Sequence, residues 1–244
     1  MSFSISGKGA VALIGCAALS LSVAACSAGS SSGGSGGGGA GATASHTASA
    51  DPDAGLPTGT QLKADLVSTG IPAAYALDAS GSVDTGSDYQ APSASATSGG
   101  TDCTSLDGTS WVSLAGLGSV SFAENDYVDQ DTSEEFAQEI DAFQGTGAQD
   151  VMTALADITA KCPTFKDSQT SSTVKVSVAT STSPDDGSVA ITLSDPQWEA
   201  ATTLEAVRVG HSVVTVLSSA NSGSAAFAKS TASQIAARLA AAGN

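Results

Sequence analysis

Carboxylates are the side chains of this chain most able to support chemistry. Several carboxylates together are what Ca²⁺ requires, but the stretch Asp129-Gln130-Asp131 lacks the glycine turn and the terminal glutamate of a known calcium-binding loop. We therefore expect a solvated strand end followed by a capped helix start, and no metal or other cofactor. The acidic residues of this stretch are Glu124, Asp126, Asp129, Asp131, Glu134 and Glu135.

The groups needed for nucleophilic catalysis are scarce. His211 is the only histidine outside the Ser/Gly-rich N-terminal region, which holds His46. A Ser-His-Asp triad would have to use His211 from a tight turn, and a transition-metal site would lack a second histidine. Paired carboxylates for glycoside hydrolysis arise easily by chance among 24 acidic residues. No catalytic residue is assigned, and a non-enzymatic role is favoured over a hydrolase.

Cys26 has the most specific chemistry. It ends the run Val23-Ala24-Ala25-Cys26, which follows Lys8 and an apolar stretch over residues 10–23. This pattern resembles the lipobox of bacterial lipoproteins, so residues 1–25 are expected to be removed and Cys26 to receive a diacylglycerol thioether and further acyl groups. Two or three acyl chains anchor a protein stably. The expected location is the outer face of the cell membrane, with the lipid on Cys26 as the membrane contact.

A rival lipobox lies in the same segment, at Leu13-Ile14-Gly15-Cys16. Cleavage there would leave only residues 10–14 as an apolar core, and the mature protein would keep a second apolar stretch. Cys26 uses the whole apolar run, which is shorter than the ~20 residues that span a bilayer. A plain secretory signal and an uncleaved anchor are the remaining alternatives.

Composition restricts the partners of the mature protein. The formal net charge of the 244 residues is −16, and such a surface repels nucleic acid. Residues 26–54 are Gly, Ser, Ala and Thr with almost no apolar side chain after the cysteine, which predicts a disordered tether. Residues 55–244 have the length of a single domain. The oligomeric state is left open.

The two cysteines that remain after lipidation are Cys103 and Cys162. An even pair outside the cell favours one disulfide. No Cys-x-x-Cys motif is present to lower a thiol pKa, so a structural bond is expected rather than a redox function.

Hydrophobic periodicity predicts the elements of the domain. We expect a helix capped by Thr58 or Thr60 and ended by Pro72, a strand over residues 74–77, a long mobile loop over 79–101 and a hairpin over 111–123. Phe136, Ile140 and Phe143 follow at helical spacing after possible caps at residues 131–133, which predicts a helix ended by Gly145.

The remaining elements alternate more regularly. Val151, Leu155 and Ile158 predict a second helix that ends at Cys162. Strands are expected around residues 174–178, 189–193, 203–209 and 212–217, with a type II′ hairpin at Gly210-His211. A final helix begins near residue 222, with Arg238 complementing its dipole. The expected fold is α+β, a twisted antiparallel sheet with helices packed on one face.

This order of elements is similar to that of actinobacterial surface lipoproteins related to the PknH-like extracellular sensor domain. The similarity rests on layout over residues 56–242: a Leu-Pro-Thr start, the stretch Asp126-Tyr127-Val128, two helices closed by a cysteine, a late tryptophan and a Val-Arg-Val-Gly hairpin. It implies a sensor or binding domain with a cleft. That family has two disulfides, whereas this chain can form one, and no kinase domain is present here.

Aromatic side chains are the candidates for lining a ligand pocket, since such sites are largely apolar and aromatic. We consider Trp111, Tyr127 and Trp198, although a core position is favoured for Trp111. The expected function is a lipid-anchored extracytoplasmic binding or sensor module for a small molecule, a lipid or a cell-envelope component. The alternatives are a secreted hydrolase with a carboxylate or serine site, and an envelope protein-interaction module.

Overall fold

The computed structural model describes residues 51–91, 103–106, 118–132, 134–167, 170–181, 187–219 and 223–243. The signal peptide, the lipid on Cys26 and residues 26–50 of the tether lie outside these residues and stay predictions. Trp111 and the strand expected over residues 111–115 lie outside them as well. None of the described helices is long and apolar enough to cross a membrane.

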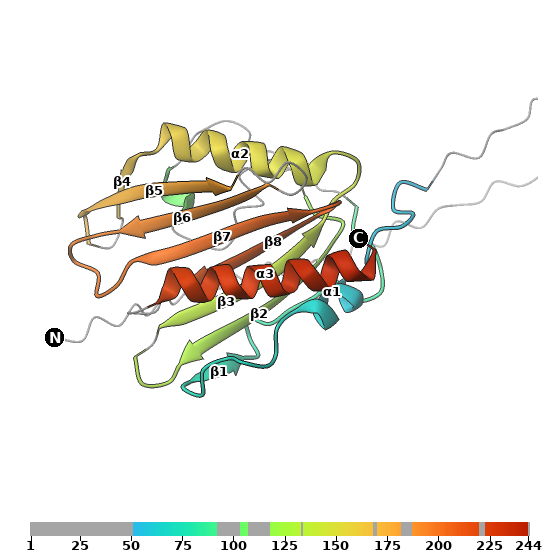
Figure 1. Ribbon diagram of the computed structural model, residues 1–244, viewed down its shortest axis with the longest axis horizontal. Helices are drawn as coiled ribbons and strands as arrows, with labels where there is room; N and C mark the ends of the chain where they lie inside the picture. The colour runs from blue at the N-terminus through green and yellow to red at the C-terminus, as the bar shows by residue number, and fades with distance from the viewer. Residues whose placement is uncertain are drawn as a thin grey trace, which may run out of the picture. The chain divides into compact units, whose positions relative to one another are not determined.

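An eight-stranded antiparallel sheet forms the centre of the domain, in the order β1-β2-β3-β8-β7-β6-β5-β4 (Figure 1). The expected α+β class with an antiparallel sheet is therefore confirmed. Gly210 has a φ of +55°, as the first loop residue of the expected β7–β8 hairpin requires. The strands are β1 (Tyr75–Asp78), β2 (Ser121–Asp129), β3 (Glu135–Ala142), β4 (Thr164–Lys166), β5 (Thr173–Ser181), β6 (Ser188–Ser194), β7 (Thr202–Val209) and β8 (Ser212–Ser218).

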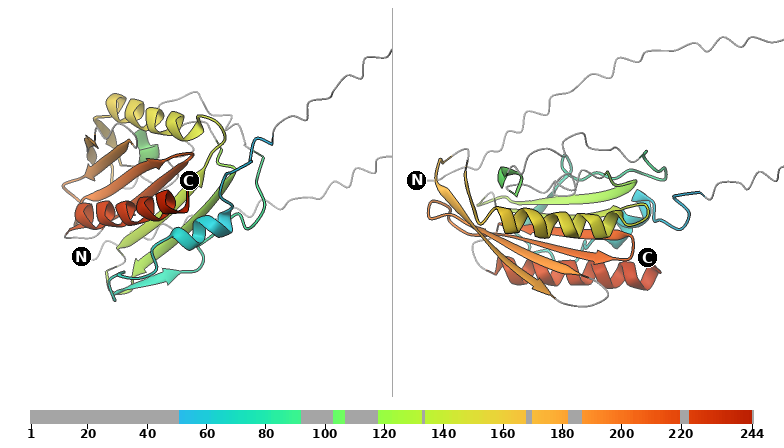
Figure 2. Two further views of the ribbon diagram at one scale, coloured as in Figure 1. Left: turned by 45° about the vertical axis from the view of Figure 1, so that its right-hand side comes forward. Right: turned by 90° about the horizontal axis from the view of Figure 1, so that it is seen from above.

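The helices cover both faces of the sheet, so the expectation that they pack on one face is wrong (Figure 2). Val213 of β8 packs in one core with α2 (Gly147–Lys161), whereas its neighbour Val214 packs in a second core with α1 (Gly59–Asp65) and α3 (Ser224–Ala242). The physical reason is the run from Val213 to Leu217, which is too continuously apolar for a strand with a solvated face.

Residues 135–142 form strand β3, and the helix expected there is wrong. Phe136 and Ile140 are four residues apart, a spacing that places them on one face of a strand as well as on one face of a helix. Both are fully buried in the core under α3. Pairing with β2 on one side and β8 on the other decides in favour of the strand. The other predicted helices are present as α1, α2 and α3, although α1 ends at Asp65, where Leu66 is already extended, and does not continue towards Pro72 as expected.

Helix α1 begins as the sequence predicts. The amide of Gln61 donates to Thr58 Oγ1 at 3.4 Å, and the amide of Thr58 donates to Gln61 Oε1 at 2.8 Å, which completes a capping box. The folded part starts earlier than residue 55, because Gln144 Nε2 donates to Asp53 Oδ1 at 2.6 Å. The end of the tether is thus held against the domain.

Arg238 caps a different helix from the one that contains it. Its guanidinium donates to the carbonyl oxygens of Asp65 at 3.1 Å and Leu66 at 2.8 Å, which are at the C-terminal end of α1. A cation at this end of a helix also interacts favourably with the helix dipole. Helix α3 therefore stabilises α1.

We expect Arg238→Met to lower the free energy of unfolding by about 1 kcal/mol, since a half-buried charged donor to two carbonyls is lost while the aliphatic stem is kept. Urea denaturation measures the change. Gln234→Met is the control, because Gln234 is exposed on the same helix and bonds only within it. Equal stability of the two variants would refute the capping role.

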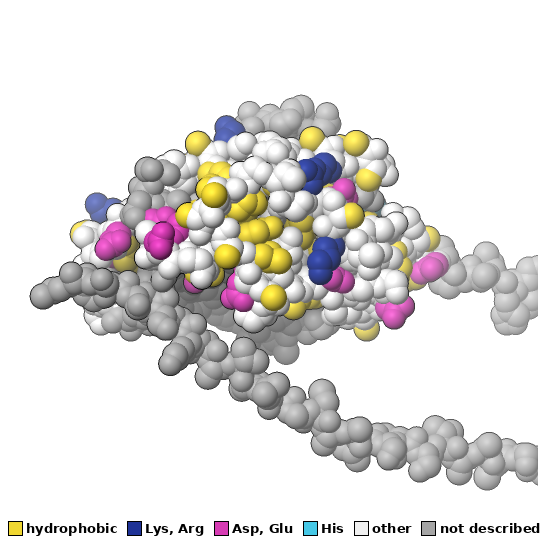
Figure 3. Space-filling model, turned by 90° about the horizontal axis from the view of Figure 1, so that it is seen from below, with side chains coloured by type: hydrophobic (Ala, Val, Ile, Leu, Met, Phe, Trp, Pro, Cys, Tyr) yellow, Lys and Arg dark blue, Asp and Glu magenta, His cyan; other side chains and the backbone are white. Residues whose placement is uncertain are grey.

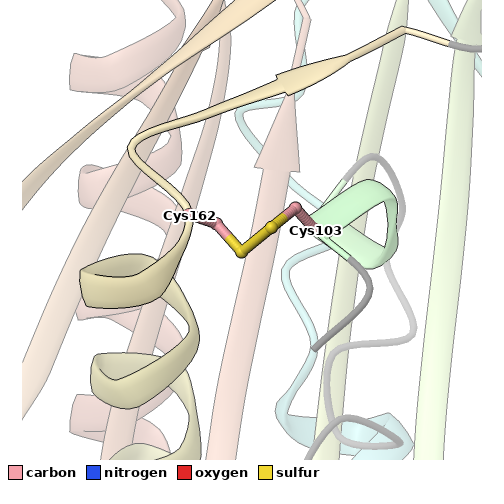
Figure 4. Close-up of a disulfide and its surroundings, with 2 residues drawn as sticks. All are labelled: Cys103 and Cys162. Atoms are coloured by element: carbon pink, nitrogen blue, oxygen red, sulfur yellow. A yellow bond between two sulfur atoms is a disulfide. The ribbon is translucent and has the colours of Figure 1, made fainter. Parts of the chain in front are cut away.

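The expected disulfide is present. Cys103 lies in the 3-10 turn η1 (Cys103–Leu106), Cys162 directly follows α2, and their Cα atoms are 5.6 Å apart (Figure 4). The bond joins segments that are 59 residues apart in the sequence. It holds η1 on the α2 side of the sheet, where Leu106 is fully buried.

The first part of the expected mobile loop is paired with the sheet. After β1 the chain moves away from β2 for a few residues and then pairs with it again. Val83 and Glu124 exchange backbone hydrogen bonds of 3.1 and 2.8 Å, and the amide of Thr85 donates to the Phe122 carbonyl. Residues 83–85 therefore extend the sheet edge that β1 begins. Residues 92–101 lie outside the described part of the chain.

Candidate functional site

Strands β2 and β3 present two chemically different faces. Side chains alternate between the faces of a strand, so residues two apart lie together. Tyr127 and Phe136 lie on the face covered by α1 and α3. Glu124 and Glu139 lie on the opposite face, which is the face that α2 covers further along the sheet.

Four carboxylates gather on this second face, and we call them the carboxylate cluster. Glu124 and Glu139 are direct cross-strand partners. Each is hydrogen-bonded to the carboxyl group two residues further along its own strand, Glu124 to Asp126 and Glu139 to Asp141. Like charges directly opposite each other destabilise a sheet, so the cluster is costly while all four groups are ionised.

Burial is the main influence on the protonation of the carboxylate cluster. Burial and the neighbouring charges of Asp126 and Asp141 raise the pKa of Glu124 to about 7. Burial also raises the pKa of Asp126 to about 6, with the charges of Glu135 and Asp78 adding to the effect. These shifts follow from the loss of hydration, which disfavours the charged form of a carboxyl group.

The β3 half of the cluster is affected in the same direction. Burial raises the pKa of Asp141 to about 6, although hydrogen bonds with Ser119 and Glu139 oppose the increase. Burial, followed by the charges of Asp141 and Glu124, raises the pKa of Glu139 well above its ordinary range. Interacting groups of this kind share protons and titrate as a set rather than singly.

Among the described residues, no basic group neutralises the carboxylate cluster. Residues 64–160 contain no lysine, arginine or histidine, although they hold sixteen of the 24 acidic residues. Lys63, just before this segment, is paired with Asp84, with 2.7 Å between Nζ and Oδ2. Asp126 Oδ1 and Asp141 Oδ2 are buried and accept no hydrogen bond from any described residue. These carboxyl groups therefore lose their charge by taking up protons, since no described lysine, arginine or histidine pairs with them.

The cluster does not have the geometry of a metal site. Among the described residues, no group of three or more His, Cys, Asp or Glu side chains is arranged to hold a metal ion. Asp129, which the calcium hypothesis included, instead accepts from the backbone amides of Asp131 and Thr132 at 2.8 and 3.0 Å. It closes the turn between β2 and β3.

Aromatic side chains dominate the opposite face of the same strands. The ring of Phe136 lies 5.5 Å from that of Tyr127 and 4.7 Å from that of Phe227, measured between centroids. Leu77 pairs with Tyr127 in the sheet and is 52% exposed. Figure 3 shows hydrophobic side chains gathered on this side of the molecule, where β1 and α1 lie. We call the following group the aromatic surface: Ile71, Tyr75, Leu77, Tyr127, Phe136 and Phe227.

The proposed ligand residues do not meet at one site. Tyr127 is one of the buried members of the aromatic surface, and its hydroxyl donates to the Val67 carbonyl at 3.4 Å. Trp198 packs against the core on the α2 side of the sheet, and its Nε1 donates to Asp167 Oδ2 at 3.1 Å. These two side chains belong to opposite faces of the sheet. Trp111 lies outside the described residues.

The described residues do not assemble a nucleophile with a general base. Ser172 Oγ donates to Asp195, but no histidine joins this pair; Gln197 N also donates to Asp195 Oδ1, at 2.7 Å, which makes the carboxylate part of a turn. His211 is exposed in the β7–β8 turn as expected, with Nδ1 3.1 Å from the Gly145 carbonyl oxygen. Neither arrangement has the order of groups that a catalytic triad needs.

Glu139 and Asp141 were not recognised as site residues from the sequence. The helical spacing of Phe136, Ile140 and Phe143 predicts a helix for this segment, and a helix does not pair with the strand that holds Glu124 and Asp126. The sequence does contain a usable signal, since Glu124-x-Asp126 and Glu139-x-Asp141 both show acidic residues two apart, the period of a strand. Antiparallel pairing of the two segments then brings all four carboxylates to one face.

No model of a known protein family matches this chain. A search of the curated proteins finds no match either. The similarity to the PknH-like sensor domain therefore remains a hypothesis based on the order of elements.

Proposed function

We propose that the chain is a lipid-anchored extracytoplasmic binding or sensor module, and that it binds its ligand at the aromatic surface rather than catalysing a reaction. The observation that supports this proposal is the continuous path from fully buried to exposed aromatic and aliphatic groups. Phe136 is fully buried, Phe227 and Tyr75 are half-buried, and Leu77 is exposed. Ligand sites combine such apolar side chains with a few polar groups.

A polar group is present at the edge of this surface. The hydroxyl of Tyr75 donates to Glu134 Oε2 at 3.3 Å, so a donor and an acceptor lie beside the apolar side chains. The ligand class that fits is a molecule with an apolar part and a hydroxyl or amine, such as a small lipid or an envelope component.

Native mass spectrometry of the domain purified from its own host tests the proposal. We expect added mass from a retained ligand, and we expect Leu77→Asp to abolish it, since a charge is placed in the apolar contact. Val178→Asp is the matched control, because Val178 is also a largely exposed apolar residue, 43% against 52% for Leu77, but lies on β5. An unliganded wild-type protein, or equal loss in both variants, would argue against binding here.

The lipid anchor is tested separately. We expect Cys26→Ser to move the protein from the membrane fraction to the medium, because the thioether to diacylglycerol can no longer form. Cys16→Ser, which removes the rival lipobox cysteine, should leave the protein in the membrane fraction. The reverse outcome would assign the lipid to Cys16, and an unmodified Cys26 peptide in the wild type would refute lipidation.

A hydrolase remains the second candidate function, because carboxyl groups with raised pKa values are the groups that act as general acids. The carboxylate cluster supplies such groups at Glu124 and Asp126. A panel of chromogenic glycosides and esters tests this candidate. Turnover that disappears in Glu124→Gln would support the hydrolase over the binding module.

A further inference from the structure

We propose that the sheet edge formed by β1 and residues 79–85 is a pH-sensitive latch, that is, a segment that opens from the sheet in response to pH. The edge is closed at mildly acidic pH, where the carboxylate cluster is protonated, and it opens more often as the carboxyl groups of the cluster ionise. The inference does not depend on which ligand the domain binds. It rests on the position of the edge over the cluster, on the surrounding charges and on the hydrogen bonds that the edge makes.

The edge is packed directly onto Asp126. A Cβ atom on Gly81 would come within 2.1 Å of Asp126 Oδ2, so any larger residue at this position would displace the Asp126 carboxylate. Ser82 Oγ accepts from the amide of Asp126 at 3.2 Å and donates to the Asp78 carbonyl at 2.8 Å. The carboxylate of Asp126 is therefore enclosed by the segment that it supports.

In the described part of the chain, the charged groups around Asp126 are all acidic. Asp78 faces it from β1, Glu135 from β3, and Glu124 from its own strand. On the far side of β3, strand β8 places Val213 and Thr215 opposite Asp141 and Glu139, and neither residue is ionisable. Segment η1 on this face holds no charged residue. Lys63 from α1 is bound to Asp84. Ionisation therefore adds repulsion that no described neighbour offsets.

The direction of the effect follows from proton linkage. The folded domain binds protons more tightly than an open or unfolded state does, because burial raises the pKa of Glu124 to about 7 and that of Asp126 to about 6. The advantage of the closed edge is therefore fully present below about pH 4, the range of unshifted carboxyl groups, and it is lost as the pH rises through the folded pKa values. The stability of the edge falls, rather than rises, towards neutral pH.

Few hydrogen bonds hold the edge to the sheet, so a change in charge can shift the equilibrium between its closed and open forms. β1 has four residues, and beyond it the described contacts with β2 are mainly those of Val83 and Thr85. An exposed edge of this kind opens with a much smaller free energy than the core does. One unit of pKa shift corresponds to a tenfold change in an equilibrium. After allowance for solvent screening, we expect opening to increase about tenfold between about pH 5 and pH 8.

Amide hydrogen exchange followed by mass spectrometry tests the latch, with rates corrected for the intrinsic effect of pH. We expect protection of peptides covering residues 75–85 and 121–129 to fall about tenfold from pH ~5 to pH ~8. Peptides covering β6 and β7 serve as the internal control and should change little. Equal protection of the edge at both pH values would overturn the proposal.

Matched variants identify the groups responsible. Glu124→Gln combined with Asp126→Asn mimics the protonated cluster and should keep the edge closed at both pH values. Asp157→Asn, which removes one negative charge from the exposed side of α2, should leave the pH response of the wild type intact. If the double variant does not fold, Glu139→Gln alone should reduce the response. A full response in the variants would show that other groups control the edge.

Discussion

Removing the disulfide should lower the free energy of unfolding by about 4 kcal/mol, the value expected when a cross-link closes a loop of this length. Cys103 and Cys162 are 59 residues apart in the sequence, and Cys162 is fully buried beside α2. Domains of this size have a net stability of about 5–15 kcal/mol, so the loss is a large share of the total. Urea denaturation of the Cys103→Ala/Cys162→Ala double variant measures it.

Reductant provides the control for this experiment. A thiol reductant should bring the wild-type protein close to the stability of the double variant, and it should not affect the variant. Non-reducing peptide mapping should recover the Cys103 and Cys162 peptides linked to each other. A wild-type protein with two free thiols, or one that is indifferent to reductant, would contradict the prediction.

Replacing Gln138 by alanine should destabilise the domain by about 3 kcal/mol, because the buried side chain is lost together with its two hydrogen bonds to Val67, which leaves the Val67 amide unpaired. The Gln138 side chain accepts from the amide of Val67 at 2.9 Å and donates to the Val67 carbonyl at 2.6 Å. It is itself fully buried in the middle of β3. These two bonds attach the segment after α1 to the sheet.

Two further variants separate hydrogen bonding from packing at this position. Gln138→Leu retains most of the side-chain volume and should still cost about 2 kcal/mol, because the Val67 amide is left unpaired and the Val67 carbonyl keeps only the bond of 3.4 Å from the Tyr127 hydroxyl. Gln144→Ala, which removes a half-buried glutamine bonded to Asp53, should cost well under that amount. Chemical denaturation of all three variants makes the comparison. Wild-type stability of Gln138→Leu would show that the two bonds contribute nothing net.

An element could be predicted from the sequence where its apolar residues fit only one period, either that of a helix or that of a strand. Helix α2 was predicted because Val151, Leu155 and Ile158 fit only the helical period over a long segment. β3 was mistaken for a helix because its alternation is hidden: Gln138, a polar residue, occupies a buried position between Phe136 and Ile140. A buried polar side chain with specific partners cannot be anticipated from a hydrophobic pattern.

The carboxylate cluster was predicted only in part. Glu124 and Asp126 were noted as part of an acidic stretch, but their partners come from another strand and are selected by antiparallel register. Register depends on tertiary pairing, which a single sequence does not supply. The same limitation explains why the helices were expected on one face of the sheet. Coverage of both faces depends on the position of β8 between β3 and β7, which is also set by tertiary pairing.

The strand order has a consequence for synthesis of the chain on the ribosome. β3 pairs with β8, so Phe136 is synthesised well before Ser218, its partner in the sheet. Contacts so distant in sequence form late. Until then β1, β2 and β3 can pair with one another, but β3 remains an open edge of this small sheet. The carboxylates of β2 and β3 are hydrated and charged in this incomplete chain. Their repulsion opposes association of the open edge with other chains until β8 is made.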